Sequence, residues 1–312
     1  MFENLNSPSI HVPLSLSEFS QTAIRYPDAK VWAGGTAIMS RDKSYPSREK
    51  NPEVLYIDNI EELKKVSRND RMIEIGSTVS LNEILKSHRT SIPPLLRDNI
   101  LDIGSPLLTD KATIGGAIAA SSPMSTIPGT LIVLGANAEI RSLKKKKIVK
   151  SKWTPLNLLV NVLKNGQIAL PQGTLITRIR ISLQPSDFSY FKKEGSYIDD
   201  VNNTVAVSFT ANEGPETLIN PHIAITFPNE GIVYSKDLDN VFLQLHFPLS
   251  RQDFMQLMQI TYTFINAVTP NITKLQQSRL NYIFEDMINT INTRVLAPST
   301  FEGGIVQGNQ IE

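Results

Sequence analysis

Residues 32–38 are Trp32-Ala33-Gly34-Gly35-Thr36-Ala37-Ile38, and residues 111–118 are Lys111-Ala112-Thr113-Ile114-Gly115-Gly116-Ala117-Ile118. Each stretch has a Gly-Gly pair beside a threonine, at the end of an apolar run. Glycine tolerates positive φ and lets backbone N–H groups approach a ligand, because no Cβ stands in the way. Two such turns lying together would form a concave set of donors suited to a diphosphate. Each stretch taken alone is equally well explained by a tight turn or by close packing.

The composition bounds the class of protein. With 312 residues the chain has room for two or three domains, and 41% hydrophobic and 20% charged residues are ordinary for a soluble globular protein. A net charge of +1 gives no reason to expect nucleic acid or an anionic membrane as a partner. No apolar run approaches the roughly 18 residues of a membrane span, and the N-terminus has no signal-peptide character, so a cytoplasmic location is the default expectation. Cysteine is absent, which excludes disulfides, thiol nucleophiles and cysteine-ligated iron–sulfur clusters within this chain.

The first half of the chain predicts alternating helices and strands. Capping boxes predict three helix starts, at Ser15 with Glu18, Asp58 with Glu61, and Ser80 with Glu83. Short apolar runs between them predict strands at Val31–Trp32, Val54–Ile57 and Met72–Ile75. This order indicates an α/β patterned region around the first glycine stretch.

The second half differs in pattern. Further strands are predicted at Thr130–Ile140, Leu175–Leu183, Thr204–Thr210, His222–Phe227 and Val241–Leu245, and helices at Arg251–Val268 and Leu275–Thr290. Lys144–Lys147 is interpreted as a solvated hairpin tip, with a nucleic-acid or lipid contact as the alternative. Pro185 marks a domain boundary, and residues 297–312 are expected to be a frayed tail.

Common catalytic and phosphate-binding signatures are missing from the sequence. It contains neither a P-loop nor a Rossmann glycine motif, and no serine lies in a G-x-S-x-G context. The histidines at 11, 88, 222 and 246 lack metal-ligand spacing, so they are expected to be surface or hydrogen-bonded core residues. The acidic pair Asp199-Asp200 is expected to face solvent. The two glycine stretches therefore remain the candidate site.

Several further motifs accompany the glycine stretches. The complete set is Pro13–Phe19, Ala33–Ile38, Tyr56–Leu63, Ile75–Ile84, Ser105–Gly116 and Ser122–Ala136. In order and spacing the set resembles the FAD-binding medium subunit of the molybdenum hydroxylases, the group that contains xanthine dehydrogenase and carbon monoxide dehydrogenase. The resemblance extends from residue 1 to about residue 290.

The resemblance implies an α+β protein with a vanillyl-alcohol-oxidase (PCMH)-type FAD-binding fold of two subdomains, followed by a small α+β C-terminal domain. The implied bounds are residues 1–60 and 61–184 for the subdomains and 185–296 for the C-terminal domain, with 297–312 as the tail. It also implies a division of labour: a molybdopterin-binding large subunit oxidises the substrate, a [2Fe-2S] ferredoxin-like subunit relays electrons, and the flavin subunit passes them to NAD or another acceptor. The lack of cysteine in this chain agrees with that division.

The resemblance also implies a set of FAD-binding residues. In the first stretch they are Val31, Trp32, Ala33, Gly34, Gly35, Thr36, Ala37 and Ile38; in the second they are Thr113, Ile114, Gly115, Gly116 and Ala117. Single positions elsewhere are Ile103, Gly104, Thr126, Leu175, Ile176 and Lys193. Lys193 corresponds to a lysine near the flavin ring, and Leu175 and Ile176 to the strand against it.

Several positions depart from the family's pattern. Ala37 and Ala117 replace polar residues, Thr126 stands where an aspartate normally bonds FAD, and Thr109-Asp110 replaces an Arg-Asn pair. Each lost neutral hydrogen bond costs roughly 0.5–1.5 kcal/mol, whereas backbone donors survive substitution. Two alternatives therefore stay open: a flavin-free scaffold subunit that keeps the fold to dock partner chains, and a stand-alone flavin reductase of the same fold superfamily.

Overall fold

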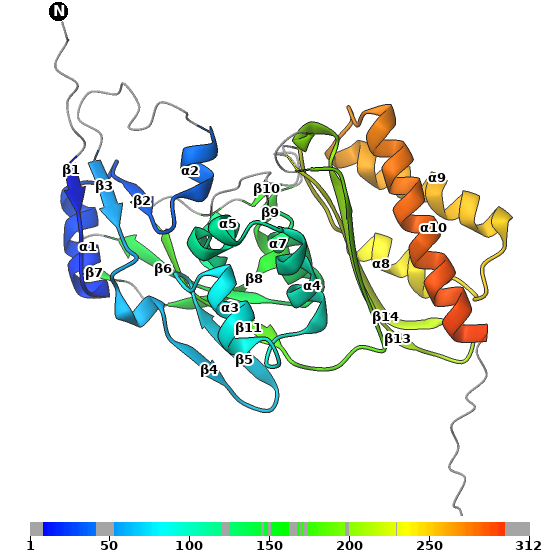
Figure 1. Cartoon of the computed structure of the whole chain (residues 1–312), viewed down its shortest axis with the longest axis horizontal. Helices are drawn as coiled ribbons and strands as arrows, with labels where there is room; N and C mark the ends of the chain where they lie inside the picture. The colour runs from blue at the N-terminus through cyan, green and yellow to red at the C-terminus, as the bar shows by residue number, and fades with distance from the viewer. Residues whose placement is uncertain are drawn as a thin grey trace, which may run out of the picture.

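The computed structural model (Figure 1) describes residues 9–41, 53–119, 125–144, 147–148, 151–161, 167–168, 170, 174–196, 200–228 and 230–296. The strands are β1 (Ser9–His11), β2 (Lys30–Trp32), β3 (Glu53–Tyr56), β4 (Val66–Arg68), β5 (Met72–Gly76), β6 (Asn137–Lys144), β7 (Lys147–Ile148), β8 (Lys152–Pro155), β9 (Val160–Asn161), β10 (Gln167–Ile168), β11 (Thr174–Ser182), β12 (Phe188–Glu194), β13 (Val205–Glu213), β14 (Leu218–Phe227) and β15 (Gly231–Val233). The helices are α1 (Leu16–Arg25), α2 (Thr36–Arg41), α3 (Leu81–His88), α4 (Pro94–Asp102), α5 (Pro106–Lys111), α6 (Ile114–Ala119), α7 (Ile127–Val133), α8 (Lys236–Leu243), α9 (Arg251–Val268) and α10 (Lys274–Leu296).

A small parallel sheet carries the first glycine stretch. Its order is β1-β3-β2, and Trp32 of β2 pairs with Tyr56 of β3, so the stretch begins where β2 ends. Helix α1 covers this sheet through the buried Phe19, which packs with Leu55 and Ile57. The sheet therefore holds the N-terminal arm of the glycine turn in place.

The central sheet has the order β4-β5-β11-β6-β7, with β8 paired to β6, and all its pairs are antiparallel. Alternation along β11 sends Ile179 and Ile181 into a core that also contains residues of α3, α4, α6 and α7. Helices α3, α4 and α7 lie over the sheet in Figure 1, and α6 contacts both β11 and α7. The second glycine stretch is part of this helical layer, because it forms the start of α6.

A second antiparallel sheet, β12-β13-β14-β15, forms the C-terminal part. Helices α8, α9 and α10 pack on one face through a core that includes Phe209, Phe242 and Phe284 (Figure 1). The opposite face meets α4 and α7. Both faces of β13 are consequently buried, and α4 and α7 lie between two sheets.

The expected fold class is confirmed, as are most expected elements. Ser15 and Ser80 cap α1 and α3, since their hydroxyls accept hydrogen bonds from the N–H groups of Glu18 and Glu83. The expected strands at 31–32, 54–57, 72–75, 175–183, 204–210 and 222–227 correspond to β2, β3, β5, β11, β13 and part of β14. The predicted helix Arg251–Val268 matches α9, and Leu275–Thr290 lies within α10.

Three expected elements are wrong. The proposed capping box of Asp58 caps nothing: a 3-10 turn (Glu61–Leu63) follows Ile60 without a side-chain cap, and Asp58 accepts the Tyr56 hydroxyl instead. The predicted strand Thr130–Ile140 is two elements, α7 and β6, separated by Gly135 at φ 63°. Every residue of α7 is buried, so its sequence shows no amphipathic period.

The predicted strand Val241–Leu245 is also wrong, because Val241 to Leu243 end helix α8. Ser235 caps that helix by accepting from the N–H of Asp237, and Leu238 and Phe242 lie one helical turn apart on its buried face. The helices α2, α4, α5 and α6 were not expected at all. They are short, and glycine or proline stands within or beside most of them.

Other expectations are untested. Lys145, Lys146, Asp199, part of the Ser122–Ala136 motif and the tail 297–312 lie outside the described residues. Strands β6 and β7 do pair antiparallel across Lys144 and Lys147, as a hairpin requires. The domain bounds remain a prediction, and the cores cross them: Leu175 joins the first core, while Ala224 and Ile232 join the central one. None of the described helices combines the length and apolar composition that crossing a bilayer would require.

Candidate cofactor site

The two glycine stretches lie against each other. A Cβ on Gly34 would overlap the carbonyl oxygen of Lys111, at the end of α5, so only glycine permits this backbone approach. A Cβ on Gly35, whose φ is 72°, would overlap the Trp32 ring. The two glycine stretches are far apart in the sequence and pack against each other in the structure, as predicted.

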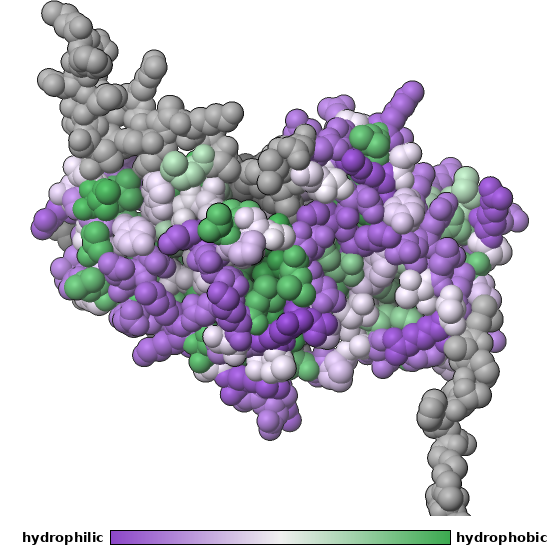
Figure 2. All heavy atoms as spheres, in the orientation of Figure 1, coloured by the Kyte–Doolittle hydropathy of each residue, from purple (hydrophilic) through white to green (hydrophobic). Residues whose placement is uncertain are grey.

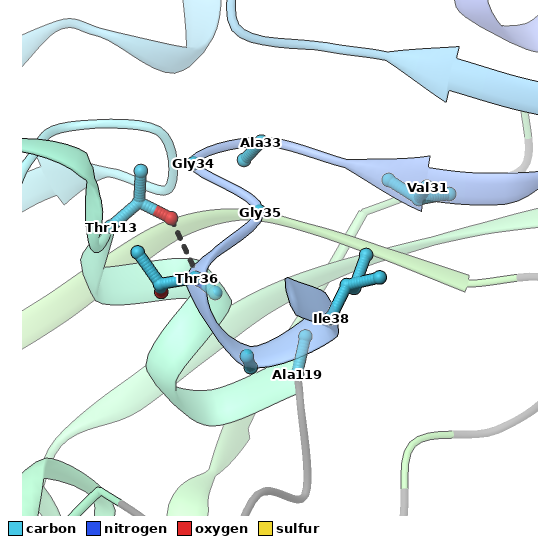
Figure 3. A pocket seen from close by; sticks show the side chains of 10 residues that line it. Val31, Ala33, Gly34, Gly35, Thr36, Ile38, Thr113 and Ala119 are labelled. Atoms are coloured by element: carbon cyan, nitrogen blue, oxygen red, sulfur yellow. Dashed lines mark hydrogen bonds between the residues drawn. The ribbon is translucent and has the colours of Figure 1, made fainter. Parts of the chain in front are cut away.

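A cavity of about 140 Å³ opens between the two stretches (Figure 3). Its lining consists of Val31, Ala33, Gly34, Gly35, Thr36, Ala37, Ile38, Thr113, Gly116 and Ala119. None of these residues carries a charge. Three of them are alanines, whose side chains are a single methyl group and take little space in the cavity. A space of this size takes a group of several heavy atoms rather than a whole dinucleotide. An uncharged lining is compatible with an anionic group held by backbone dipoles.

The two stretches differ in the backbone donors that they offer. Within the second, the N–H of Ile114 donates to the Val79 carbonyl at 3.1 Å, and that of Gly115 to the Ser77 carbonyl at 2.9 Å. The N–H of Gly116 donates to the Thr113 hydroxyl at 3.1 Å, the dashed bond in Figure 3.

The first stretch is open by comparison. Among hydrogen bonds that join the described residues, none uses the N–H of Gly34, Gly35 or Thr36. All three residues line the cavity, so the first stretch has backbone donors beside it that the described residues do not use.

A second, adjoining cavity of about 410 Å³ shares Ala33, Gly34 and Thr113 with the first. The rest of its lining is Trp32, Tyr56, Asp58, Lys64, Thr78, Ser80, Glu83, Asp110 and Lys111. This second lining therefore carries charges of both signs, three carboxylates and two ammonium groups, unlike the uncharged first cavity. The buried hydroxyl of Thr78 has no hydrogen-bond partner and was not singled out from the sequence.

Thr126, a predicted FAD contact, is not in the lining of either cavity. It is 1% exposed, and its hydroxyl donates to the Asn99 side-chain oxygen at 2.6 Å. The Asn99 amide donates to Thr130 at 2.6 Å, and the Thr130 hydroxyl lies 2.7 Å from that of Ser208 on β13. The Thr126 hydroxyl is thus hydrogen-bonded within the protein, as the first member of a series of buried polar side chains.

Lys193 lies on β12 and meets α4 of the central layer. Its ammonium lies 2.6 Å from a carboxylate oxygen of Asp102 and donates to the Asp102 carbonyl at 3.1 Å. Asp102 directly precedes Ile103 and Gly104, so three of the positions taken from the resemblance converge at the end of α4. Gly104 has φ 79°, and a Cβ there would meet only the Asp102 carbonyl oxygen, at 3.8 Å. There is therefore room beside the Gly104 backbone.

The remaining predicted positions are packed into the protein. Leu175 and Ile176 are 7% and 4% exposed and belong to the first and central cores. Ile114 is buried, Ala117 packs against the central core, and a Cβ on Gly115 would lie 2.6 Å from the Ser77 carbonyl oxygen. Of the departing pair, Thr109 bonds the carbonyls of its own helix and Asp110 accepts from Asn82.

The histidine expectations hold where partners are seen. His11 bonds Glu53 at 2.6 Å and stacks on Tyr26, and His222 bonds Asp239 at 3.0 Å. Within the described ranges, no group of three or more histidines, aspartates and glutamates could hold a metal ion. Asp200 remains partly exposed, and hydrogen bonds from Asn203 and from Arg279, at 2.6 Å, lower the pKa of its carboxyl.

Comparisons with known proteins agree with this geometry. Residues 3–183 match the family model described as the FAD binding domain in molybdopterin dehydrogenase. A chain of the Cu,Mo-CO dehydrogenase structure superposes with a TM-score of 0.75 at 16% identity, covering 94% of this chain and 100% of that one. A chain of quinoline 2-oxidoreductase from Pseudomonas putida 86 gives 0.73 at 14% identity, covering 94% and 99%.

The sequence is also similar to xanthine dehydrogenase 2 of Arabidopsis thaliana, with 24% identity over 151 residues. The match takes in 43% of this chain and 11% of that enzyme, so the chain spans about a tenth of the length of this curated relative.

Proposed function

We propose, from the premise that this chain belongs to the family of FAD-binding domains of molybdopterin dehydrogenases, that it holds FAD on its first glycine stretch and transfers electrons between a partner subunit and an acceptor. The observation that carries the proposal is the uncharged cavity between the stretches, which is lined by Gly34, Gly35 and Thr36, three residues whose N–H groups bond none of the described residues.

The residues present fit the diphosphate of FAD. The first stretch would donate its three backbone N–H groups, and the second would form the opposite wall with Thr113 and Gly116. The cluster of Lys193, Asp102 and Gly104 would lie toward the flavin ring, where a paired lysine adds less positive charge than a free one. FAD supplies the ability to accept electrons in pairs and release them singly or in pairs. The chain's own residues would bind and orient it.

Partner subunits complete the proposed function. We propose that a [2Fe-2S] ferredoxin-like chain delivers electrons from a molybdopterin-binding chain, with NAD or another molecule as acceptor, because this chain has no cysteine to hold a cluster. Figure 2 shows apolar side chains gathered over the region of α3, α4 and α5. Leu101, Leu107 and Leu108 of α4 and α5 are 48%, 83% and 39% exposed, which suits a docking surface.

A flavin-free scaffold is the second candidate. It is favoured by Thr126, whose hydroxyl is committed to Asn99 rather than open to a cofactor, and by the alanines at 37 and 117. The fold and the docking surface would be kept in this case, while the cofactor would be lost.

An optical titration separates the two candidates. Purified protein incubated with FAD should show oxidised-flavin absorption that stays with the protein on gel filtration and bleaches with dithionite. The matched control is Gly34→Ala, which should retain no flavin. A wild-type protein that stays colourless at high FAD concentration rules out the flavoprotein and leaves the scaffold.

A further inference from the structure

A separate cavity of about 280 Å³ lies where the central layer meets the C-terminal sheet. The end of α7 and the residues after β11 form one side, and β13 and β14 form the other. Its lining is Val133, Leu134, Gly135, Ser182, Gln184, Pro185, Ser186, Thr210, Ala211, Asn212, Asn220 and His222. It shares no residue with the two cavities at the glycine stretches.

The lining combines uncharged polar groups with apolar ones. Three amides (Gln184, Asn212 and Asn220) and three hydroxyls (Ser182, Ser186 and Thr210) line it together with Val133, Leu134 and Ala211. Apart from the imidazole of His222, no lining residue can carry a charge. The polar groups of this lining are side-chain amides and hydroxyls, which can donate to and accept from the polar edges of a neutral ligand.

Thr210 lies at the buried side of this cavity with an unused hydroxyl. It is 7% exposed, and strand alternation puts its side chain on the same face of β13 as Ser208, which bonds Thr130 of α7. None of the hydrogen bonds among the described residues involves the Thr210 hydroxyl. The hydroxyl oxygen itself is not enclosed by protein atoms, so it is accessible from the cavity that Thr210 lines and available to a ligand there.

Strand β13 is irregular where it borders the cavity. The pairing of β13 with β14 shifts register between Thr210 and Asn212, a bulge of the kind that re-aims a side chain. The Asn212 oxygen accepts from the N–H of Asp187 at 3.3 Å, which leaves its amide NH₂ for a ligand. Asn220 has φ 49°, a left-handed conformation that is uncommon outside glycine and recurs at binding sites.

His222 is held in one orientation. Its Nδ1 lies 3.0 Å from one carboxylate oxygen of Asp239, and the other oxygen accepts from the N–H of Ile223 at 3.0 Å. The carboxylate is 10% exposed and thus largely shielded from water. An Nδ1–H donated to Asp239 makes Nε2 the acceptor of the ring that lines the cavity.

We propose that this interdomain cavity binds a small, uncharged, planar heterocycle with amide-like edges, of nucleobase to nucleoside size. Asparagine and glutamine amides pair two-fold with the adjacent donor and acceptor of such an edge. His222 Nε2 accepts from a ring N–H, the Thr210 hydroxyl bonds at the floor, and Leu134 and Val133 cover the ring face. The volume lies near the lower end for small-molecule pockets.

The test is a calorimetric or NMR titration of the whole chain with adenosine, guanosine, cytidine and uridine, and with glucose as a neutral polyol of similar size. At least one nucleoside should saturate with a dissociation constant on the order of 1 mM or tighter. Thr210→Val should weaken it roughly 2- to 10-fold, and Asn212→Ala by a similar factor, as expected for single hydrogen bonds.

The matched control is Thr261→Val, because Thr261 is another buried threonine with an unpartnered hydroxyl, on α9 and outside the cavity lining. This variant should leave the affinity unchanged. The proposal is overturned if no nucleoside saturates at its solubility limit, if glucose binds in place of the nucleosides, or if both cavity variants bind like the wild type. FAD absorption is measured separately, so loss of the flavoprotein assignment would not alter this result.

Discussion

At the scale of single residues, Gly34 is required first for the packing of the two glycine stretches against each other and only then for binding a ligand. Its missing Cβ lets the backbone of the first stretch touch the carbonyl of Lys111, and this contact holds the two stretches together. Gly35 and Gly115 are restricted in the same way by Trp32 and Ser77. The two explanations that the sequence left open, close packing and ligand approach, therefore apply to the same residues.

Replacement of Gly34 by alanine should separate the two stretches. Overpacking of this kind costs about 1–3 kcal/mol, so the free energy of unfolding should fall by that amount and FAD retention should be lost. Denaturant unfolding and flavin absorption measure the two effects. Gly135→Asn is the control: its φ is 63°, nothing lies near the added Cβ, and asparagine tolerates this conformation. Equal FAD binding by Gly34→Ala and wild type would contradict this placement of the site.

Glu139 makes the stability of the central sheet depend on acid pH. Burial alone would raise the pKa of its carboxyl, but hydrogen bonds from Arg178, Thr177 and Ser151 lower it to about 2. Because the folded pKa lies below the ordinary 4.5, the carboxylate contributes stability that is complete above that value and lost as the pH falls toward 2. At 1.36 kcal/mol per unit, the contribution is about 3 kcal/mol.

Glu139→Gln should therefore lower the free energy of unfolding near neutral pH by about 3 kcal/mol and flatten its decline between pH 4.5 and about 2. Urea unfolding across this pH range provides the measurement. The exposed Glu285 supplies the control, since Glu285→Gln should preserve the wild-type slope. An unchanged slope in the Glu139 variant would show that another group titrates.

At the scale of elements, a chain of buried polar groups joins three of them. Thr126 and Thr130 of the α7 segment, Asn99 of α4 and Ser208 of β13 bond in sequence. Asn99 is the centre of this chain, because its amide serves two threonines at once and is fully buried. It thereby ties the FAD-binding part to the C-terminal sheet.

Asn99→Ala should lower the free energy of unfolding by about 2–4 kcal/mol, since it leaves buried hydroxyls without a partner and opens a small void. Thermal or denaturant unfolding checks the value. Asn289→Ala, on the exposed side of α10, should change stability by less than about 0.5 kcal/mol. If Asn99→Ala lowers the free energy of unfolding by no more than Asn289→Ala does, water replaces the side chain of Asn99.

The helices show how far the sequence alone could go. Helices α1, α3 and α9 begin at capping serines and have one apolar face, so their bounds could be predicted. Helix α7 could not, because all seven of its residues are buried between two sheets and its apolar run resembles a strand. The strand expected at Val241–Leu245 is wrong because only Val241 to Leu243 belong to α8, and three residues are too few to show a helical period.

At the scale of the whole molecule, the site is built between units rather than on one of them. The glycine stretches come from the first sheet and the central helical layer, and Lys193 of the C-terminal sheet reaches Asp102 of α4. The order of motifs predicted the two stretches as neighbours. It could not predict that Thr126 turns inward, because that depends on Asn99, 27 residues away in the chain.

Binding of FAD should stabilise the whole chain. At a hundredfold excess over the dissociation constant, a ligand specific for the folded state adds about 2.7 kcal/mol. For a chain of this size the melting temperature should rise by roughly 5 °C or more, as read by scanning calorimetry. Gly34→Ala should show no rise at the same concentration. A wild-type protein whose melting temperature ignores FAD would favour the scaffold.

The internal bonds of the second stretch have a consequence for assembly. The backbone N–H groups of Ile114, Gly115 and Gly116 bond to Val79, Ser77 and Thr113 without any ligand. The cavity between the two glycine stretches is therefore preformed. Empty protein should therefore be loaded after synthesis is finished, and exchange with synthetic flavin analogues should proceed without denaturant. That property would allow FAD to be replaced in this chain by flavin analogues of a chosen redox potential.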